Sequence, residues 1–189
     1  MHPQPPPQPP PLLQHDFVVL QQLRAVTRSD FHFLDAAGAP IATVTGGNHS
    51  FFMGTRELYV SDVTGPVFHL TDPVDFMLDT FEFFAPNGQP LGRVKQRMAV
   101  MNQAFDVEVF DGSRLHLERR AFSHDITFTL GQFVVGRAAQ QWAGFTSFML
   151  GRDQYGLQYD PGAPPHHRIA MLAALLALDL HDAKQQNST

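Results

Sequence analysis

The chain of 189 residues contains no cysteine. This absence excludes disulfides, thiolate catalysis, cysteine-rich zinc sites and S-acyl anchors. Cations are also few: 13 Lys and Arg stand against 18 Asp and Glu, and no window gathers them into a cluster. A nucleic-acid-binding face needs such a cluster, and so does a surface that holds anionic lipid by charge alone. We therefore expect no nucleic-acid partner.

Long apolar runs are scarce as well, and one that does occur is short. Residues 169–178 read Ile-Ala-Met-Leu-Ala-Ala-Leu-Leu-Ala-Leu, with no polar side chain on any face. Helix formers dominate this stretch, yet ten helical residues rise only about 15 Å, roughly half of a bilayer core. A helix on the protein surface would have a polar side. We therefore expect a helix enclosed by the protein's own strands.

The middle of the chain repeats one pattern five times: an apolar-rich run, a turn with glycine and a second run. The paired runs are 31–34 with 40–44, 58–60 with 67–70, 81–84 with 91–94, 105–110 with 115–117, and 126–130 with 133–135. Asn87-Gly88 and Asp111-Gly112 are dipeptides typical of tight hairpin turns. The 17 Phe residues also fit a β-rich core. The pattern predicts five successive β-hairpins.

These hairpins, with flanking strands at 17–23 and 157–159, give about twelve strands. Closing an antiparallel sheet into a barrel removes its exposed edges. Because about eight strands already make a barrel filled by its own side chains, a larger barrel needs something more in its lumen. We therefore predict a mainly β fold, a closed antiparallel barrel of about twelve strands around the buried hydrophobic C-terminal helix.

The two flanks of the chain differ from this middle part. Residues 1–14 are rich in Pro and Gln and predict a disordered leader, with one domain over 15–182 and a disordered tail over 183–189. The leader has PxxP spacings at Pro3 with Pro6 and at Pro7 with Pro10, which an SH3-type groove could bind. A solubilising leader without a partner is the simpler interpretation. The leader also lacks the basic and apolar regions of a signal peptide.

Three segments near the end of the chain carry a family resemblance. Residues 135–145 read Val-Gly-Arg-Ala-Ala-Gln-Gln-Trp-Ala-Gly-Phe, residues 154–159 read Gln-Tyr-Gly-Leu-Gln-Tyr, and residues 170–179 form the apolar stretch ending in Asp. In order and spacing they resemble phospholipid scramblases, which have Val-Gly followed by Lys-Gln-Trp-Ser-Gly, then Asn-Phe-Gly-Ile-Gln-Phe, then an apolar helix ending in Asp. The chain is similar to the wider tubby-like group, which includes LURP-one-related domains and implies a twelve-stranded barrel around a hydrophobic helix.

The resemblance implies membrane-associated phospholipid binding or phospholipid scrambling, by a cytoplasmic protein peripheral to the inner face of the plasma membrane. Scrambling has the weaker physical basis, because a helix buried in its own barrel cannot also span lipid. We expect headgroup contact at a loop face. The alternative is an intracellular scaffold or regulatory binding domain without lipid transport.

Scramblases also carry a calcium loop before the final helix, with acidic residues at its first, third and twelfth positions. Here these positions hold Gly151, Asp153 and Gly162, with Asp160 nearby. Calcium takes six to eight oxygen ligands, so this degenerate loop predicts weak binding at Asp153 and Asp160 or none. An ordinary turn is the alternative, and we expect no cofactor.

Other candidate sites are weaker. His166 and His167 are adjacent, so on a helix they diverge by about 100° and are not expected to chelate one ion easily; they suit the entry to the final helix. Ser123, His124 and Asp125 are neighbours in sequence, which does not build a catalytic triad. The chain has no nucleophile elbow, P-loop or dinucleotide fingerprint. We therefore expect no enzyme.

The apolar residues near loops and the last acid of the helix have structural interpretations. Trp142, the only Trp, and the clusters at 51–53 and 145–150 could touch lipid if exposed, but we expect them to close the barrel. Asp179 ends the apolar helix, where a carboxylate is unfavourable to the helix dipole. We expect it to pair at the barrel mouth, with Arg137 as a candidate partner.

Overall fold

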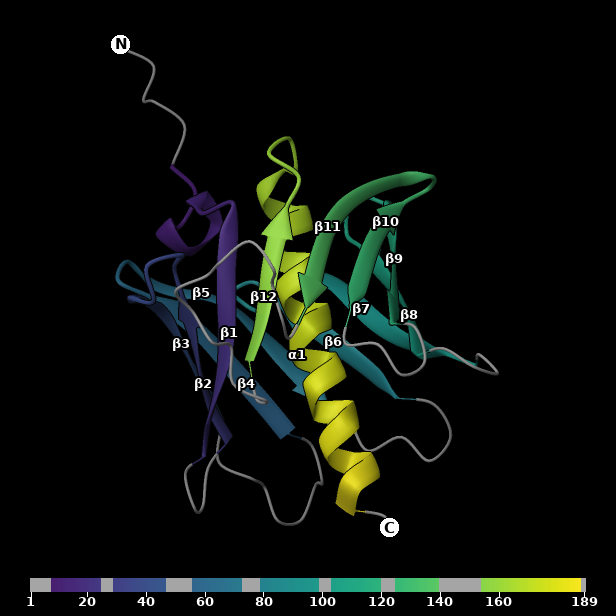
Figure 1. The fold of residues 1–189 in the computed structure, drawn as a ribbon, viewed down its shortest axis with the longest axis horizontal. Coiled ribbons are helices and arrows are strands. Elements are labelled where there is room, and N and C mark those ends of the chain that lie inside the picture. Colours follow the sequence, from purple (N-terminus) through teal and green to yellow (C-terminus); the bar gives the residue numbers. More distant parts are fainter. Residues whose placement is uncertain are drawn as a thin grey trace.

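The computed structural model describes residues 8–24, 29–46, 56–72, 79–98, 103–119, 125–139 and 154–187. These residues form a short 3-10 helix, twelve strands and one α-helix (Figure 1). In chain order the elements are η1 (Pro11–Gln14), β1 (Phe17–Arg24), β2 (Ser29–Leu34), β3 (Pro40–Gly46), β4 (Arg56–Asp62), β5 (Gly65–Asp72), β6 (Thr80–Phe84), β7 (Pro90–Arg97), β8 (Gln103–Val109), β9 (Arg114–Arg119), β10 (Ile126–Leu130), β11 (Phe133–Ala139), β12 (Gln154–Tyr159) and α1 (Pro165–Asn187).

All twelve strands form one closed antiparallel barrel. Each strand pairs with its neighbours in the chain, and β1 closes the barrel by pairing with both β2 and β12. The closure leaves no sheet edge exposed. The predicted mainly β fold, a closed barrel of twelve strands with a C-terminal helix, is therefore confirmed.

The five predicted hairpins have tight turns built in a similar way. In four of them a side-chain oxygen of Asp or Asn accepts a backbone N–H two residues further on: Asp35 from Ala37, Asp62 from Thr64, Asn87 from Gln89 and Asp111 from Ser113. Each turn also contains a glycine with positive φ, such as Gly112 at 85°. Only glycine adopts this conformation without strain, so the turn residues fix where each hairpin reverses.

The lumen of the barrel holds α1. Every residue from Ala170 to Leu178 has no exposed surface, which follows from the absence of a polar face in this stretch. Inward-facing Phe side chains from β2, β6, β8 and β10 belong to the same core. In Figure 1 the helix, in yellow-green to yellow, runs lengthwise among the strands. The core of the domain is thus the contact between the barrel wall and one helix.

Close approach of the wall to the helix depends on a missing side chain. A Cβ added at Gly136 of β11 would lie 2.5 Å from the Met171 sulfur and 3.3 Å from the Gln158 carbonyl oxygen. Real Cβ atoms do not come this close to a heavy atom, so a glycine is required here for packing. The position therefore couples β11 directly to α1.

Both ends of the domain extend further than the sequence predicts. Leu12 and Leu13 of η1 belong to the predicted leader, yet both are buried, and the Leu12 amide donates to Asp62 at 3.2 Å. At the other end α1 continues to Asn187, although a disordered tail is expected from residue 183. The last turns of α1 have no apolar pattern, and polar contacts with the barrel wall hold them in place. Among the described residues, no helix has the length and hydropathy that a membrane crossing requires.

Candidate functional site

The barrel has one end made of tight turns. Because consecutive strands run in opposite directions, the turns after β2, β4, β6, β8 and β10 lie at the same end, and α1 begins there after β12. We call this the turn end. The connections at the other end include residues outside the described ranges. Among the described residues, polar side chains gather at three places: at the turn end, around the C-terminal part of α1, and on the outer face of the barrel.

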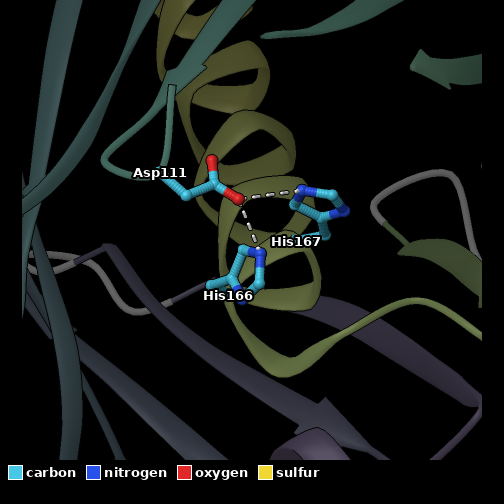
Figure 2. A group of neighbouring side chains, drawn as sticks. All are labelled: Asp111, His166 and His167. Carbon is cyan, nitrogen blue, oxygen red and sulfur yellow. Dashed lines mark ion pairs between the residues drawn. The ribbon is translucent and has the colours of Figure 1, made fainter. Parts of the chain in front are cut away.

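A carboxylate and two imidazoles meet at the turn end (Figure 2). Asp111 lies in the β8–β9 turn, whereas His166 and His167 are in the first turn of α1. The Asp111 Oδ2 atom lies 2.9 Å from His166 Nε2 and 3.7 Å from His167 Nε2. The Ser113 hydroxyl oxygen is 2.9 Å from the same His167 nitrogen. We call Asp111, His166 and His167 the imidazole cluster.

The convergence of the two imidazoles corrects the expectation that helical divergence keeps them apart. Side chains in a helix lean toward its N-terminus, so those of the first turn reach past the helix end, toward Asp111. The two rings lie 4.5 Å apart between centroids, at 73° to each other. A single ligand atom of each residue lies within 4.8 Å of the other two. The cluster has the composition of a partial metal site.

The charge states in the cluster follow from its surroundings. Hydrogen bonds from the hydroxyl and the backbone amide of Ser113 lower the pKa of Asp111 below its usual value, with His166 and His167 adding to the effect. Burial lowers the pKa of His167, and the neighbouring His166 lowers it further. At neutral pH the arrangement therefore favours an ionised carboxylate beside a neutral His167 imidazole.

The next residue, Arg168, holds the N-terminal segment against the helix. Its side chain is 7% exposed and donates to the carbonyl oxygens of Leu13 at 3.2 Å and His15 at 2.9 Å. It also donates to Asp16 at 2.7 Å and to the Ala163 carbonyl at 3.0 Å. A buried guanidinium is tolerated when its donors are satisfied in this way. Arg168 therefore closes the turn end and has a structural role.

The C-terminal part of α1 is surrounded by a polar network. The His181 imidazole lies 2.5 Å from Asp79, and the Lys184 ammonium lies 2.7 Å from Asp72 and 3.0 Å from Asp79. Burial alone would raise the pKa of Asp79, but the hydrogen bonds from His181 and Lys184 hold it below its usual value. Burial raises the pKa of Asp72 in spite of Lys184. The network anchors the end of the helix that the apolar core does not hold.

The outer face of β7, β8 and β9 gathers cations around one carboxylate. Arg93 bonds directly to Glu108, with Lys95 at 3.7 Å and Arg114 at 3.2 Å from the same side chain. The three cations keep 48%, 39% and 57% of their side-chain surface exposed. Their positive charge lowers the pKa of Glu108, the hydrogen bond from Arg93 most of all. We call Arg93, Lys95 and Arg114 the cationic triad.

Two exposed aromatic side chains lie at the turn end of the barrel, on the β8–β9 and β10–β11 hairpins. Phe110 follows β8 at the turn end and is 58% exposed, and Phe133 at the start of β11 is 69% exposed. Phe110 lies two residues beyond Glu108, at the start of the turn, and its ring meets His166 edge-on at 5.8 Å. An exposed aromatic beside cations is a combination typical of surfaces that contact a membrane interface.

The predicted calcium residues do not form a described site. Asp160 is an exposed turn residue whose carboxylate accepts the Gly162 amide at 2.9 Å. It lines a shallow groove of about 320 Å³ with Val134, Gly136, Arg137, Gln158, Tyr159 and Pro161. Asp153 lies outside the described residues. Calcium binding by the pair stays a prediction.

Several other predicted residues also fall outside the described ranges: Trp142, the clusters at 51–53 and 145–150, Ser123, His124 and the first PxxP spacing. Asp179 and Arg137 are described, and the structure places them differently from the expected pair. Arg137 is on β11 and is exposed, so it faces the outside of the barrel. Asp179 lies on α1 inside the barrel, where its charge acts on Arg56 and Tyr155.

Comparison with known proteins addresses the family directly. A sequence model described as LURP-one-related matches residues 15–179. The chain belongs to the LURP-one-related family. No curated protein and no solved structure gives a significant match. The match covers the whole barrel and most of α1, so the LURP-one-related domain here is the twelve-stranded barrel with its helix.

The imidazole cluster, Arg168 and the cationic triad are not visible in the sequence as motifs. Each of them joins residues more than ten positions apart, and only the strand register brings Arg93 and Arg114 next to Glu108. Alternation along β7 gives a partial signal, because Arg93, Lys95 and Arg97 occupy every second position. Once β7 is assigned as a strand, this spacing indicates that Arg93, Lys95 and Arg97 share its outer face.

Proposed function

We propose that this LURP-one-related domain binds phospholipid headgroups at a membrane surface through the outside of its barrel. The observation that carries the proposal is the filled lumen. Because residues 170–178 have no exposed surface, the helix is not available to enter a bilayer, and the lumen it fills offers no path for a headgroup. Lipid contact then falls to the outer face and the loops. Family membership favours a lipid ligand over other small molecules.

The cationic triad is the part of the described surface best suited to a phosphate group. Within 4 Å of the Glu108 carboxylate, three cations meet a single negative charge, and Glu82 and Asp106 lie opposite Arg93 and Lys95 on the neighbouring strands. Arginine binds phosphate oxygens through paired N–H donors. Phe110 and Phe133 can enter the interfacial region beside the headgroups. The net charge of −5 makes the rest of the chain unfavourable for anionic lipid, so binding depends on this face.

Vesicle flotation tests the proposal. The full chain should float with vesicles of phosphatidylcholine containing 30% phosphatidylserine, and much less with phosphatidylcholine alone. Each cation near an anionic surface contributes about 1 kcal/mol, so the double variant Arg93→Gln, Arg114→Gln should lower the partition coefficient about 30-fold. Arg137→Gln, which removes an exposed arginine outside the triad, is the matched control and should change it less than twofold.

The remaining outcomes separate the alternatives. If the protein stays unbound at every lipid composition, the proposal is wrong and the scaffold alternative becomes the better one. Equal losses in the double variant and the control would show that binding does not use the cationic triad. Vesicles with a fluorescent lipid in one leaflet measure transbilayer movement, and the filled lumen predicts no acceleration by the protein.

A further inference from the structure

We propose that the imidazole cluster is a binding site for a borderline divalent cation of the zinc type. The site consists of two imidazole nitrogens and one carboxylate oxygen, contributed by the β8–β9 turn and the first turn of α1. The proposal is independent of lipid binding, because none of its ligands belongs to the cationic triad.

The donor set indicates the kind of ion. Zinc binds imidazole nitrogen and carboxylate oxygen, and sites with three protein ligands and one water are common. Calcium and magnesium take oxygen ligands almost exclusively, so they fit poorly. The absence of cysteine removes thiolate as a competing ligand. Two imidazoles and a carboxylate therefore select zinc and its neighbours in the first transition row.

The distances agree with this assignment. With zinc-to-ligand distances of about 2.0 to 2.1 Å, two ligands of a tetrahedral ion lie about 3.4 Å apart. The observed separations from Asp111 Oδ2 are 2.9 Å to His166 Nε2 and 3.7 Å to His167 Nε2, on either side of this value. The ligand atoms of the two histidines lie within 4.8 Å of each other, so a tetrahedral ion would require them to approach each other by at most about 1.4 Å.

The surroundings prepare two of the three ligands. His167 is buried, with its side chain 9% exposed, so little motion is open to its ring. The Asp111 carboxylate is fixed in its turn, because its other oxygen accepts the Ser113 amide at 2.9 Å. Hydrogen bonds that orient ligating groups in this way strengthen metal binding. His166 and Asp111 are about one-third exposed, which leaves an approach for the ion and for a water ligand.

One feature works against a cation at this place. The first turn of α1 carries the positive end of the helix dipole, which favours anions. The Asp111 carboxylate lies at the same point and offsets it, and a zinc ion would return the local charge to a positive value. We therefore expect moderate affinity in the micromolar range and a mechanical effect, because the ion would fasten the β8–β9 turn to the start of the helix.

Titration calorimetry with zinc chloride on the full chain tests the site. We expect one zinc ion per chain, and affinity at least tenfold lower in His166→Gln and in Asp111→Asn. The outer face offers a matched control: His116 lies 2.6 Å from Asp106 in a similar His–Asp pair without a second imidazole. His116→Gln and Asp106→Asn should change the affinity less than twofold. His166 and Asp111 are partly exposed, so their variants should fold, which circular dichroism verifies.

Three results would overturn the proposal. The first is the absence of zinc binding at millimolar concentration. The second is binding that persists unchanged in His166→Gln and Asp111→Asn, because the ion would then occupy another of the ten histidines. The third is displacement of zinc by equimolar calcium, which this donor set does not allow. A rise in melting temperature with zinc that is lost in His166→Gln would support the fastening of turn to helix.

Discussion

The contact between Gly136 and Met171 allows a quantitative test of the helix inside the barrel. In Gly136→Ala the new methyl group would lie 2.5 Å from the Met171 sulfur. Met171 has no exposed surface, so its side chain cannot swing out to make room. Overpacking of this kind costs about 1–3 kcal/mol of unfolding free energy. We expect the substitution to destabilise the domain by that amount.

A second substitution should remove the conflict. Met171→Ala alone leaves a cavity and costs about 2–5 kcal/mol, but it also clears the space that the methyl group added at position 136 needs. The double variant should therefore be more stable than the sum of the two single effects predicts, by about 1–3 kcal/mol. The control is Met98→Ala, at a side chain that is 89% exposed, where the change should stay within about 0.5 kcal/mol.

Equilibrium unfolding in urea, at constant temperature and pH, measures the free energies of unfolding of the wild type, the two single variants, the double variant and the control. The decisive quantity is the coupling between positions 136 and 171. If the two substitutions are additive within about 0.5 kcal/mol, β11 does not pack on this face of α1. The assignment of the helix to the lumen would then be wrong.

Two further predictions concern the ends of the helix. Asp79→Asn removes the carboxylate that pairs with His181 and one of the two that pair with Lys184, and should cost about 1–3 kcal/mol at pH 6. Because the folded-state pKa of Asp79 is below its unfolded value, its contribution is complete above about pH 4 and is lost as the pH falls through the folded pKa. Urea unfolding at pH 6 and pH 3 should show the gap to the wild type narrowing, and an equal gap would contradict it. Arg168→Met leaves the carbonyl oxygens of Leu13 and His15 without their hydrogen-bond donor and should cost about 1–3 kcal/mol of unfolding free energy. Limited proteolysis should then cut near residue 14 sooner than in the wild type. Unchanged cleavage would show that Arg168 does not hold the N-terminal segment.

Much of the barrel could be predicted from local signals. A hairpin depends on residues that are close in sequence: the alternating runs, and a turn such as Asp111-Gly112 in which one side chain and one positive φ act together. The apolar stretch 169–178 is equally local, because its burial on all sides follows from its composition. Closure of the sheet into a barrel could be inferred because it removes both exposed sheet edges and because the apolar helix can fill the lumen of a barrel this large.

The polar sites could not be predicted in the same way, because each depends on contacts between distant segments. Arg168 is an ordinary arginine in sequence until the fold brings Leu13 and His15 to it. The adjacency of His166 and His167 indicates divergence, because helical periodicity gives the angle between two side chains but not their lean past the end of the helix. Likewise, the polar C-terminal part of α1 resembles a disordered tail in sequence, and only the fold brings Asp72 and Asp79 into contact with it.

The order of the chain gives the closed barrel a consequence for synthesis. The strand that completes the ring pairs with the first strand, and the segment that occupies the centre emerges from the ribosome after all twelve strands. Until then the incomplete ring would leave its Phe-rich inner wall open to water or to other chains. Productive assembly is therefore a late event, which waits for the last segment of the domain to be made.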